Sequence, residues 1–397
     1  MIEKIRKNIM LKSFIGPMII GFFIGLSCYY LGNIFNIEIY GQSLFEIPVR
    51  LLYTISKNFL QLLLFVAPLM VVIYSISGVN QIRGNAKKFF LKFFSLVFIT
   101  LLIISLISLV IGSSLVPNLM VEMDQTMDIY MDPYFIVDIQ PLFSTIVAVI
   151  MGIIFGLFLP QDSLSMKLIH EGEEWISRFA TGLLLPIMPI WVIGVFAQSA
   201  YTSSASSLFI NDLILSTIIL ILQGLWLVVM YFIVTKITKR SFKKAFYAGL
   251  KLYVKVTSIM GMGAGIIVPF AIEAQKEIEV DEAVAKIVSV SSLNMPGSVI
   301  SNIIFAYGVI TMYGLDISTM QMIVYAVVLI FATMIAPSIP GGVFSVTSSL
   351  LTPILGFNAD QIGLMGALYY KQGTSNAATN NAADVYLGPL MDSNSKI

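Results

Sequence analysis

A proline and a glycine interrupt a stretch of this chain that is otherwise apolar enough to lie in a lipid bilayer. The stretch, residues 289–302, reads Ser-Val-Ser-Ser-Leu-Asn-Met-Pro-Gly-Ser-Val-Ile-Ser-Asn. Pro296 lacks a backbone N–H and Gly297 tolerates unusual torsions, so we expect an unwound turn lined by carbonyls and by Asn294. Irregular backbone persists in hydrocarbon only where it is buried in protein or faces water. The stretch therefore predicts a broken helix in a transport pathway, with a simple Pro-Gly kink in an ordinary span as the alternative.

The composition is that of a polytopic membrane protein. Hydrophobic residues make up 57% of the 397 residues and charged residues 11%, and the mean hydropathy is +0.90. The formal net charge of +1 offers no bulk basic surface, so no nucleic-acid partner is expected. One cysteine and one histidine exclude a disulfide framework and a zinc cluster of the usual ligands. A small solute and membrane lipid are the expected partners, and no cofactor is expected.

Basic residues set the expected orientation in the membrane. Four lysines or arginines lie within the first twelve residues, and a dense basic cluster occupies residues 236–244. The linker 122–138, in contrast, carries five acidic residues and no basic one. Because cytoplasmic loops are rich in Lys and Arg, we expect a multi-pass protein of a bacterial inner or plasma membrane with both termini in the cytoplasm. The acidic linker is then a solvated external loop, or alternatively a vestibule that collects cations.

Two further apolar segments are too interrupted to be plain spans. Residues 245–269 contain a glycine-rich stretch at 261–265 and lie between charged segments, which predicts a re-entrant hairpin. Residues 320–355 are interrupted by Pro337, Pro340 and two glycines, which predicts a second hairpin of opposite orientation. Each hairpin is followed by a polar-centred helix, as in an inverted repeat. We predict an all-α polytopic membrane protein of about eight transmembrane helices plus two re-entrant helical hairpins.

The last predicted helix, residues 361–387, carries a polar face. Gln372, Asn376, Asn380 and Asp384 follow at intervals of four and so share one side of the helix. A carboxylate in a membrane segment is costly unless it is paired, protonated or metal-bound, so Asp384 is expected to be functional. The alternative is a hydrated carboxylate at the cytoplasmic end. Lys371 lies about 20 Å away along a helix and needs its own partner or a route to water.

These motifs resemble those of the dicarboxylate/amino acid:cation symporter family, the prokaryotic glutamate-transporter homologues. Residues 294–297, Asn-Met-Pro-Gly, resemble the family's Asn-Met-Asp-Gly motif, and residues 339–342, Ile-Pro-Gly-Gly, resemble the Pro-Gly turn of its second hairpin. Asn380-x-x-x-Asp384 matches the Asn and Asp of the family's last helix. The resemblance covers nearly the whole chain, and it implies a glutamate-transporter-like fold and a homotrimer.

The resemblance also implies a division of the chain into a fixed scaffold and a moving transport unit. The scaffold comprises residues 1–88, with helices one and two, and residues 141–206, with helices four and five. The transport unit comprises residues 89–140, with helix three and the acidic external loop. It also comprises residues 207–397, with helix six, the two hairpins, and helices seven and eight.

The site residues follow from the same resemblance. The expected ligands of one sodium ion, the coupling ion, are Asn294, Asn380 and Asp384, with a proton as the alternative coupling ion. The expected solute-binding residues are Gly263, Ala264, Gly265, Pro340, Gly341, Gly342, Gln372, Gly373, Asn376, Ala377 and Asn380. Pro296 stands where the family has a sodium-binding aspartate, so a second ion site of that kind is not expected. Asn376 stands where members that carry acidic amino acids have an arginine, and Gly373 where an aspartate meets the solute's ammonium.

The predicted function is secondary active transport by an elevator-type symporter. It moves a small amino acid or carboxylate across the cell membrane with a cation, because polar broken hairpins at mid-membrane suit a solute and an ion together. A passive channel and a non-transporting solute sensor of the same fold are the alternatives. A membrane enzyme is not expected, since the predicted pathway lacks histidine and cysteine, no Gly-x-Ser-x-Gly elbow occurs, and we expect no second intramembrane aspartate to form a dyad with Asp384.

Overall fold

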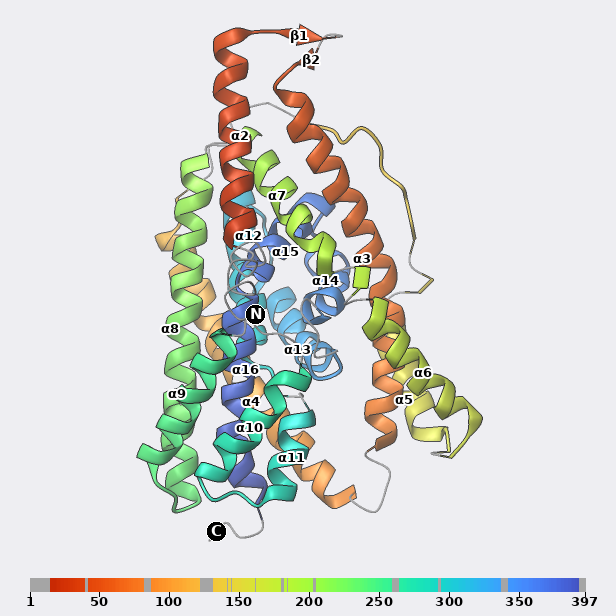
Figure 1. The fold of residues 1–397 in the computed structure, drawn as a ribbon, viewed down its shortest axis with the longest axis vertical. Coiled ribbons are helices and arrows are strands. Elements are labelled where there is room, and N and C mark those ends of the chain that lie inside the picture. The colour runs from red at the N-terminus through yellow and green to blue at the C-terminus, as the bar shows by residue number, and fades with distance from the viewer. Residues whose placement is uncertain are drawn as a thin grey trace, which may run out of the picture.

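The computed structural model describes residues 15–39, 42–81, 87–121, 131–140, 142–143, 145–160, 162–179, 182–183, 185–202, 205–258, 264–291, 294–336 and 342–392. Most of these residues are helical, as expected for an all-α membrane protein. A hairpin of two-residue strands, β1 (Glu38–Ile39) and β2 (Gln42–Ser43), was not predicted, and it closes one end of the molecule (Figure 1).

A first group of four helices packs together. It comprises α2 (Ile15–Phe35), α3 (Glu46–Gln81), α5 (Thr145–Phe158) and α7 (Leu185–Thr202). α2 and α7 approach closely, because a Cβ built on Gly21 or Gly25 would lie 2.5 or 2.3 Å from a carbonyl oxygen of α7. These are the helices that the sequence assigns to the scaffold, and their function as a fixed body stays a prediction.

The remaining long helices form a second group around α12 (Pro296–Tyr313). In α12, 83% of the residues are buried, against 22% of a window of similar length in α2, so α12 is a central helix of the fold. Around it lie α4 (Lys87–Leu119), α8 (Ala205–Ile237) and α16 (Gly373–Met391), which run side by side in Figure 1. α11 (Glu282–Ser291) precedes α12, and the predicted break separates the two helices.

Both predicted hairpins appear as pairs of helices in contact. The first is α9 (Phe242–Ser258) with α10 (Ala264–Glu277), and the second is α13 (Thr319–Met334) with α14 (Gly342–Leu355). The tips, residues 259–263 and 337–341, lie outside the described residues, and with them Gly263, Pro340 and Gly341. The other expected tip residues, Ala264, Gly265 and Gly342, belong to the first turns of α10 and α14. The last predicted helix is divided at Gln372 into α15 (Ala359–Lys371) and α16.

The mixed charges between Lys167 and Arg178 predict a cytoplasmic loop after Pro160, but residues 164–179 instead form a helix, α6 (Leu164–Phe179). Two physical features favour the helix. Glu174 and Arg178, four residues apart, form an ion pair of 3.1 Å, and Met166 and Ile176 are buried, with Ile176 packing on α3. His170 is exposed on this helix, as expected for a surface residue.

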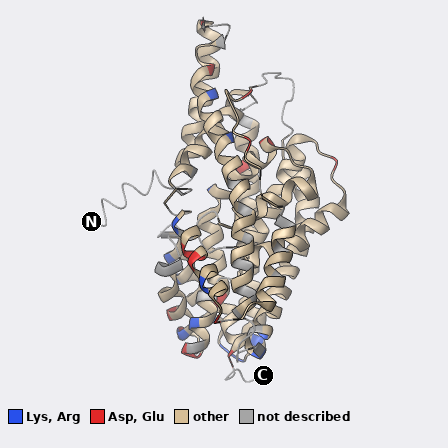
Figure 2. Cartoon of the chain, turned by 90° about the vertical axis from the view of Figure 1, so that its right-hand side faces the viewer, with Lys and Arg blue, Asp and Glu red and all other residues tan. Residues whose placement is uncertain are grey.

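Apolar helices and charged turns are separated along the long axis. Five described helices are long and apolar enough to cross a membrane, at residues 16–35, 46–70, 91–119, 207–237 and 296–313. Many of the charged residues, coloured blue and red in Figure 2, lie at the end of the molecule that holds the C-terminus. At this end, hydrogen bonds from Lys276 and Lys286 lower the pKa of Glu282 to about 2. The end with the charged turns therefore has the chemistry of a water-facing surface.

Candidate functional site

The candidate site lies where the break before α12 meets α16. The first turn of a helix leaves backbone N–H groups without partners, and the N-cap residue Met295 offers no side-chain cap. Asn380 of α16 takes that role, because its Oδ1 accepts hydrogen bonds from the backbone N–H of Gly297 (2.9 Å) and of Ser298 (3.3 Å). Its Nδ2 donates to the Ser298 hydroxyl at 2.9 Å. Asn380 therefore fastens the start of α12 to α16.

Gly297 is required by this close approach. A Cβ at this position would lie 2.9 Å from the Asn376 carbonyl oxygen, 2.9 Å from the Thr379 Cβ and 3.1 Å from the Asn380 Oδ1. Pro296 occupies the first turn, where its missing N–H is no loss and its fixed φ suits a helix start. The Pro-Gly pair thus begins a helix beside a break and does not kink a continuous one.

Four buried side chains beside Gly297 form what we call the amide cluster: Gln223, Ser301, Asn376 and Thr379. The Asn376 Oδ1 accepts hydrogen bonds from the Gln223 Nε2 (2.8 Å) and the Ser301 hydroxyl (2.6 Å). Gln223 is itself oriented, since its Nε2 also donates to the Gly297 carbonyl and its Oε1 accepts from Thr379 at 3.1 Å. The Asn376 Nδ2 is buried and has no hydrogen-bond partner in the described part of the chain. The amide cluster therefore holds one neutral donor ready for a ligand.

Asp384 lies one turn beyond Asn380 on α16. Only 4% of its surface is exposed, so the alternative of a hydrated carboxylate does not hold in this structure. Among the described residues it has no ion-pair partner, and no hydrogen bond to it is formed. The nearby Asn294 donates to the Tyr386 hydroxyl at 3.2 Å. A buried carboxylate in this condition requires a cation or a proton.

The residues expected to hold sodium fit that ion in part. Asp384 supplies a carboxylate without an ion-pair partner among the described residues, and Asn294 supplies an amide oxygen that accepts a hydrogen bond from the Tyr386 hydroxyl at 3.4 Å. Such hard oxygens suit sodium. The Asn380 side chain, in contrast, is already committed at both ends to α12. No group of three or more His, Cys, Asp or Glu side chains occurs among the described residues, so a cation here would be held mainly by Asp384 and backbone carbonyls.

The partner of Lys371 is Asp212 of α8, which the sequence analysis overlooked. The Lys371 ammonium contacts the Asp212 carboxylate and lies 2.5 Å from the Ser216 hydroxyl. Both charged side chains are buried, at 7% and 1% exposure. Asp212 is a second intramembrane aspartate, because it lies in the apolar span 207–237. It pairs with Lys371, and no described contact joins it to Asp384 as a dyad. The signal was present, since Asp212 is the one acidic residue of that span.

The other expected solute residues lie around the start of α16. Gln372 is buried, but its Nε2 donates to Ser375 and not to the amide cluster. Gly373 faces open space, since a Cβ built there meets no described atom within 4 Å. Ala377 is half-buried on the next turn. The structure thus brings Asn376 and Asn380 together with Gly297, leaves room beside Gly373, and places Lys371 elsewhere.

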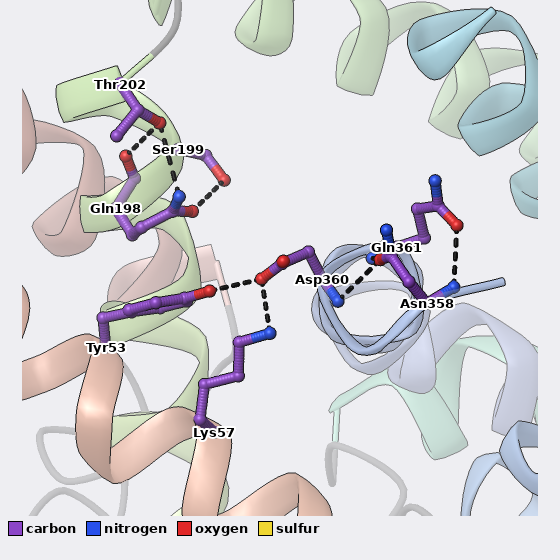
Figure 3. A network of polar contacts seen from close by, with 8 residues as sticks. All are labelled: Tyr53, Lys57, Gln198, Ser199, Thr202, Asn358, Asp360 and Gln361. Atoms are coloured by element: carbon purple, nitrogen blue, oxygen red, sulfur yellow. Dashed lines mark hydrogen bonds and ion pairs between the residues drawn. The ribbon is translucent and has the colours of Figure 1, made fainter. Parts of the chain in front are cut away.

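A separate polar contact joins the two groups of helices (Figure 3). Lys57 of α3 forms an ion pair of 2.5 Å with Asp360 at the start of α15, and the Tyr53 hydroxyl donates to the same carboxylate. A cavity of about 20 Å³ lies beside them, lined also by Gln198 and Ser199 of α7. No sequence pattern links Lys57 to Asp360, because the two residues are far apart in the chain.

Comparison with known families gives one match. Residues 10–393 match the family described as the sodium:dicarboxylate symporter family, and this match spans nearly the whole chain. Its members are transporters with a helical polytopic membrane fold, and they are not enzymes. No curated protein matches the chain.

Proposed function

The chain belongs to the sodium:dicarboxylate symporter family, and on this premise we propose that it is an elevator-type transporter that couples a small amino acid or carboxylate to sodium. Membership makes the protein a membrane transporter of the symporter kind. The solute, the coupling ion and the motion are the parts that we add.

The free amide donor of Asn376 is the observation that carries the proposed solute. Recognition of an acidic side chain needs a fixed cation, because an unpaired buried carboxylate costs several kcal/mol. Asn376 is neutral, and the nearest lysine on the same chain segment, Lys371, is engaged by Asp212. A neutral donor that lacks a partner suits a hydroxyl, an amide or a single carboxylate. We therefore propose a solute without a second acidic group, although the family's name refers to dicarboxylates.

The proposed coupling ion follows from Asp384. Its buried carboxylate lacks a cationic partner among the described residues, and Asn380, one turn before it on α16, is bonded to the first turn of α12 directly after the break. A sodium ion would neutralise the carboxylate without a change of protonation. In the same site, Asn380 holds α12 in place, so the ion and the solute would depend on one arrangement of α12 and α16.

Competition binding tests the solute proposal. Serine, alanine, aspartate and succinate are compared on the wild type and on Lys371→Met, with and without sodium. Serine and alanine are expected to bind in the presence of sodium, and aspartate and succinate to bind at least about tenfold more weakly, equivalent to 1.4 kcal/mol. Tight aspartate or succinate binding that survives the Lys371 change would show that the specificity determinant lies elsewhere. Uptake into proteoliposomes driven by a sodium gradient separates a symporter from a passive channel or a non-transporting sensor.

The proposed motion carries the second group of helices past the first. We propose a homotrimer in a bacterial cell membrane, with both termini in the cytoplasm and the charged end of Figure 2 facing the cytoplasm. Cys28 is the one cysteine of the chain, so its replacement by serine gives a background for engineered cysteine pairs. Pairs between α7 and α15 are expected to crosslink in two alternative registers. A monomer whose pairs crosslink in a single register would contradict the proposal.

A further inference from the structure

The buried ion pair of Lys371 and Asp212 lies outside the amide cluster and has no part in the function proposed above. Asp212 and Ser216 are one turn apart on α8, and their oxygens converge on the ammonium of Lys371. Lys371 is the last residue of α15, next to the point where the last helix divides. The pair thus joins α8 to the α15–α16 junction within the same group of helices.

Stability alone gives a weak reason for such a pair. Burying two charges removes their hydration, and well-packed apolar side chains of similar volume are often as stable or more stable. An oxygen without a hydrogen-bond partner also distinguishes this pair from one that only joins two helices. The Asp212 Oδ2 is buried and has no hydrogen-bond partner in the described part of the chain, so the carboxylate is not saturated by donors. Among the described residues, the Lys371 ammonium is the one positive charge that contacts this carboxylate.

The oxygens around the ammonium form the donor set of a small cation site. A carboxylate and a hydroxyl are hard oxygen donors. The ammonium of lysine carries one positive charge, as a sodium ion does, and donates its N–H groups to the oxygens that would otherwise ligate a metal. We propose that Lys371 acts as a built-in cation that fills a monovalent metal-ion position formed by Asp212 and Ser216.

The two buried carboxylates, Asp212 and Asp384, thus differ in where the cation that neutralises them comes from. Asp384 takes its cation from solution if the proposed function is correct, whereas Asp212 takes its cation from the chain. Lys371 moves with α8 and α15 and never dissociates, so the Asp212 position adds no ion to the transport cycle. Removal of the lysine head group then converts this position into a site that binds sodium from solution.

The test is the dependence of thermal unfolding on sodium, which needs no transport and no identified solute. Tm of the purified full chain is measured in rising sodium chloride, with choline chloride replacing it at constant ionic strength. All variants are made in the Asp384→Asn background, where the sodium dependence of the proposed coupling site is removed. Adding Lys371→Met is expected to create a Tm that rises with sodium, because an ion that binds only the folded state stabilises it. Adding Asp212→Asn as well is expected to abolish that rise.

Lys57→Met is the matched control, because it removes a lysine from a different carboxylate, Asp360, which is 43% exposed and hydrated without its partner. This control is expected to show no new sodium dependence. Should Lys371→Met fail to fold in choline, Lys371→Gln is used, and purification in sodium is expected to recover folded protein.

Three outcomes would overturn the proposal. The first is a Lys371 variant whose stability ignores sodium, or that sodium does not rescue. The second is a sodium effect that persists after Asp212→Asn. The third is stabilisation by acid alone, which would mean that Asp212 takes a proton and is no metal-ion position. If the proposed coupling site at Asp384 fails instead, Asp384→Asn alone leaves the sodium dependence of the wild type unchanged, and the two failures are distinguishable.

Discussion

Asp212 and Asp384 are both buried carboxylates on helices that pack together, yet their surroundings differ. Asp212 forms a buried ion pair with Lys371. Ser216, one helical turn further along α8, contacts the same ammonium. Asp384 is buried on α16, and no described side chain forms an ion pair with it. A lysine of the chain neutralises Asp212, whereas no described residue neutralises Asp384. Burial alone therefore does not distinguish the two positions, and the lack of a partner within the described chain is the feature on which we propose Asp384 as the ion site.

The largest expected effect concerns the buried ion pair of Asp212 and Lys371. Lys371→Met leaves Asp212 buried without its counter-charge, and removing one partner of a buried ion pair costs about 3–5 kcal/mol of stability. Asp212→Asn/Lys371→Met removes both charges and should recover most of that loss. Chemical or thermal unfolding in sodium-free choline buffer measures both changes. If the single and double variants are equally destabilised, the two residues are not coupled, and the contrast with Asp384 fails.

The second largest effect is expected at Asp384, which has no counter-charge among the described residues. Asp384→Asn keeps the size of the side chain and removes the charge that offsets a bound cation, so sodium dependence of solute binding and uptake should vanish. A charge in a membrane helix is worth about 3 kcal/mol on insertion scales, which corresponds to roughly 100-fold in sodium affinity. Asp212→Asn serves as the matched control and should keep the wild-type sodium dependence. Unchanged sodium dependence in Asp384→Asn would count decisively against an ion site there.

The sequence predicted the broken helices because proline, glycine and polar residues in apolar segments are local signals. The break before α12, the two hairpins and the polar face of the last helix all depend on such signals. The structure has separate helices α11 and α12 at the break and contacting helix pairs at both hairpin positions, whereas the re-entrant course of the hairpins stays a prediction. α6 was missed because its charges were read as a loop, whereas spacing of four residues pairs them along a helix.

The site was predicted less well, because its contacts join distant parts of the chain. Gln223 orients the amide of Asn376 from α8, and no pattern in the α8 sequence singles it out. The commitment of Asn380 to α12 depends on where the two helices meet, which a single sequence does not contain. Asp212 is a different case, since a lone aspartate in an apolar span was visible and its partner was the unknown. A resemblance to a family indicates which positions of the sequence belong to the site. Only the packing of the helices shows which side-chain atoms at those positions lack a hydrogen-bond partner.

A smaller effect is expected at Gly297, where α12 packs closely against α16. Gly297→Ala places a methyl group 2.9 Å from the Asn376 carbonyl oxygen, so α12 and α16 must separate. Overpacking of this kind costs about 1–3 kcal/mol, and it should weaken sodium and solute binding together. Gly373→Ala, at the start of α16, is the control, because its Cβ meets no described atom within 4 Å and should leave stability nearly unchanged. Equal effects of the two substitutions on Tm and on solute affinity would mean that the close contact at Gly297 is unimportant.

The smallest effect concerns a third carboxylate, Asp360, whose pair with Lys57 joins the proposed scaffold to the proposed transport unit. Because Asp360 is 43% exposed, water screens the pair, and such pairs contribute about 0.2–1 kcal/mol. Lys57→Met should therefore favour the alternative position of the transport unit by at most about fivefold. Crosslinking rates of an engineered α7–α15 cysteine pair in the Cys28→Ser background report that shift.

Asp360→Asn should act in the same direction, and Tyr53→Phe, which removes the second donor to Asp360, should act more weakly. The Lys57/Asp360 double variant should resemble either single one, since both remove the same contact. Additive shifts would mean that the two residues act independently, and that the contact between the two groups of helices does not hold the unit in the position seen here.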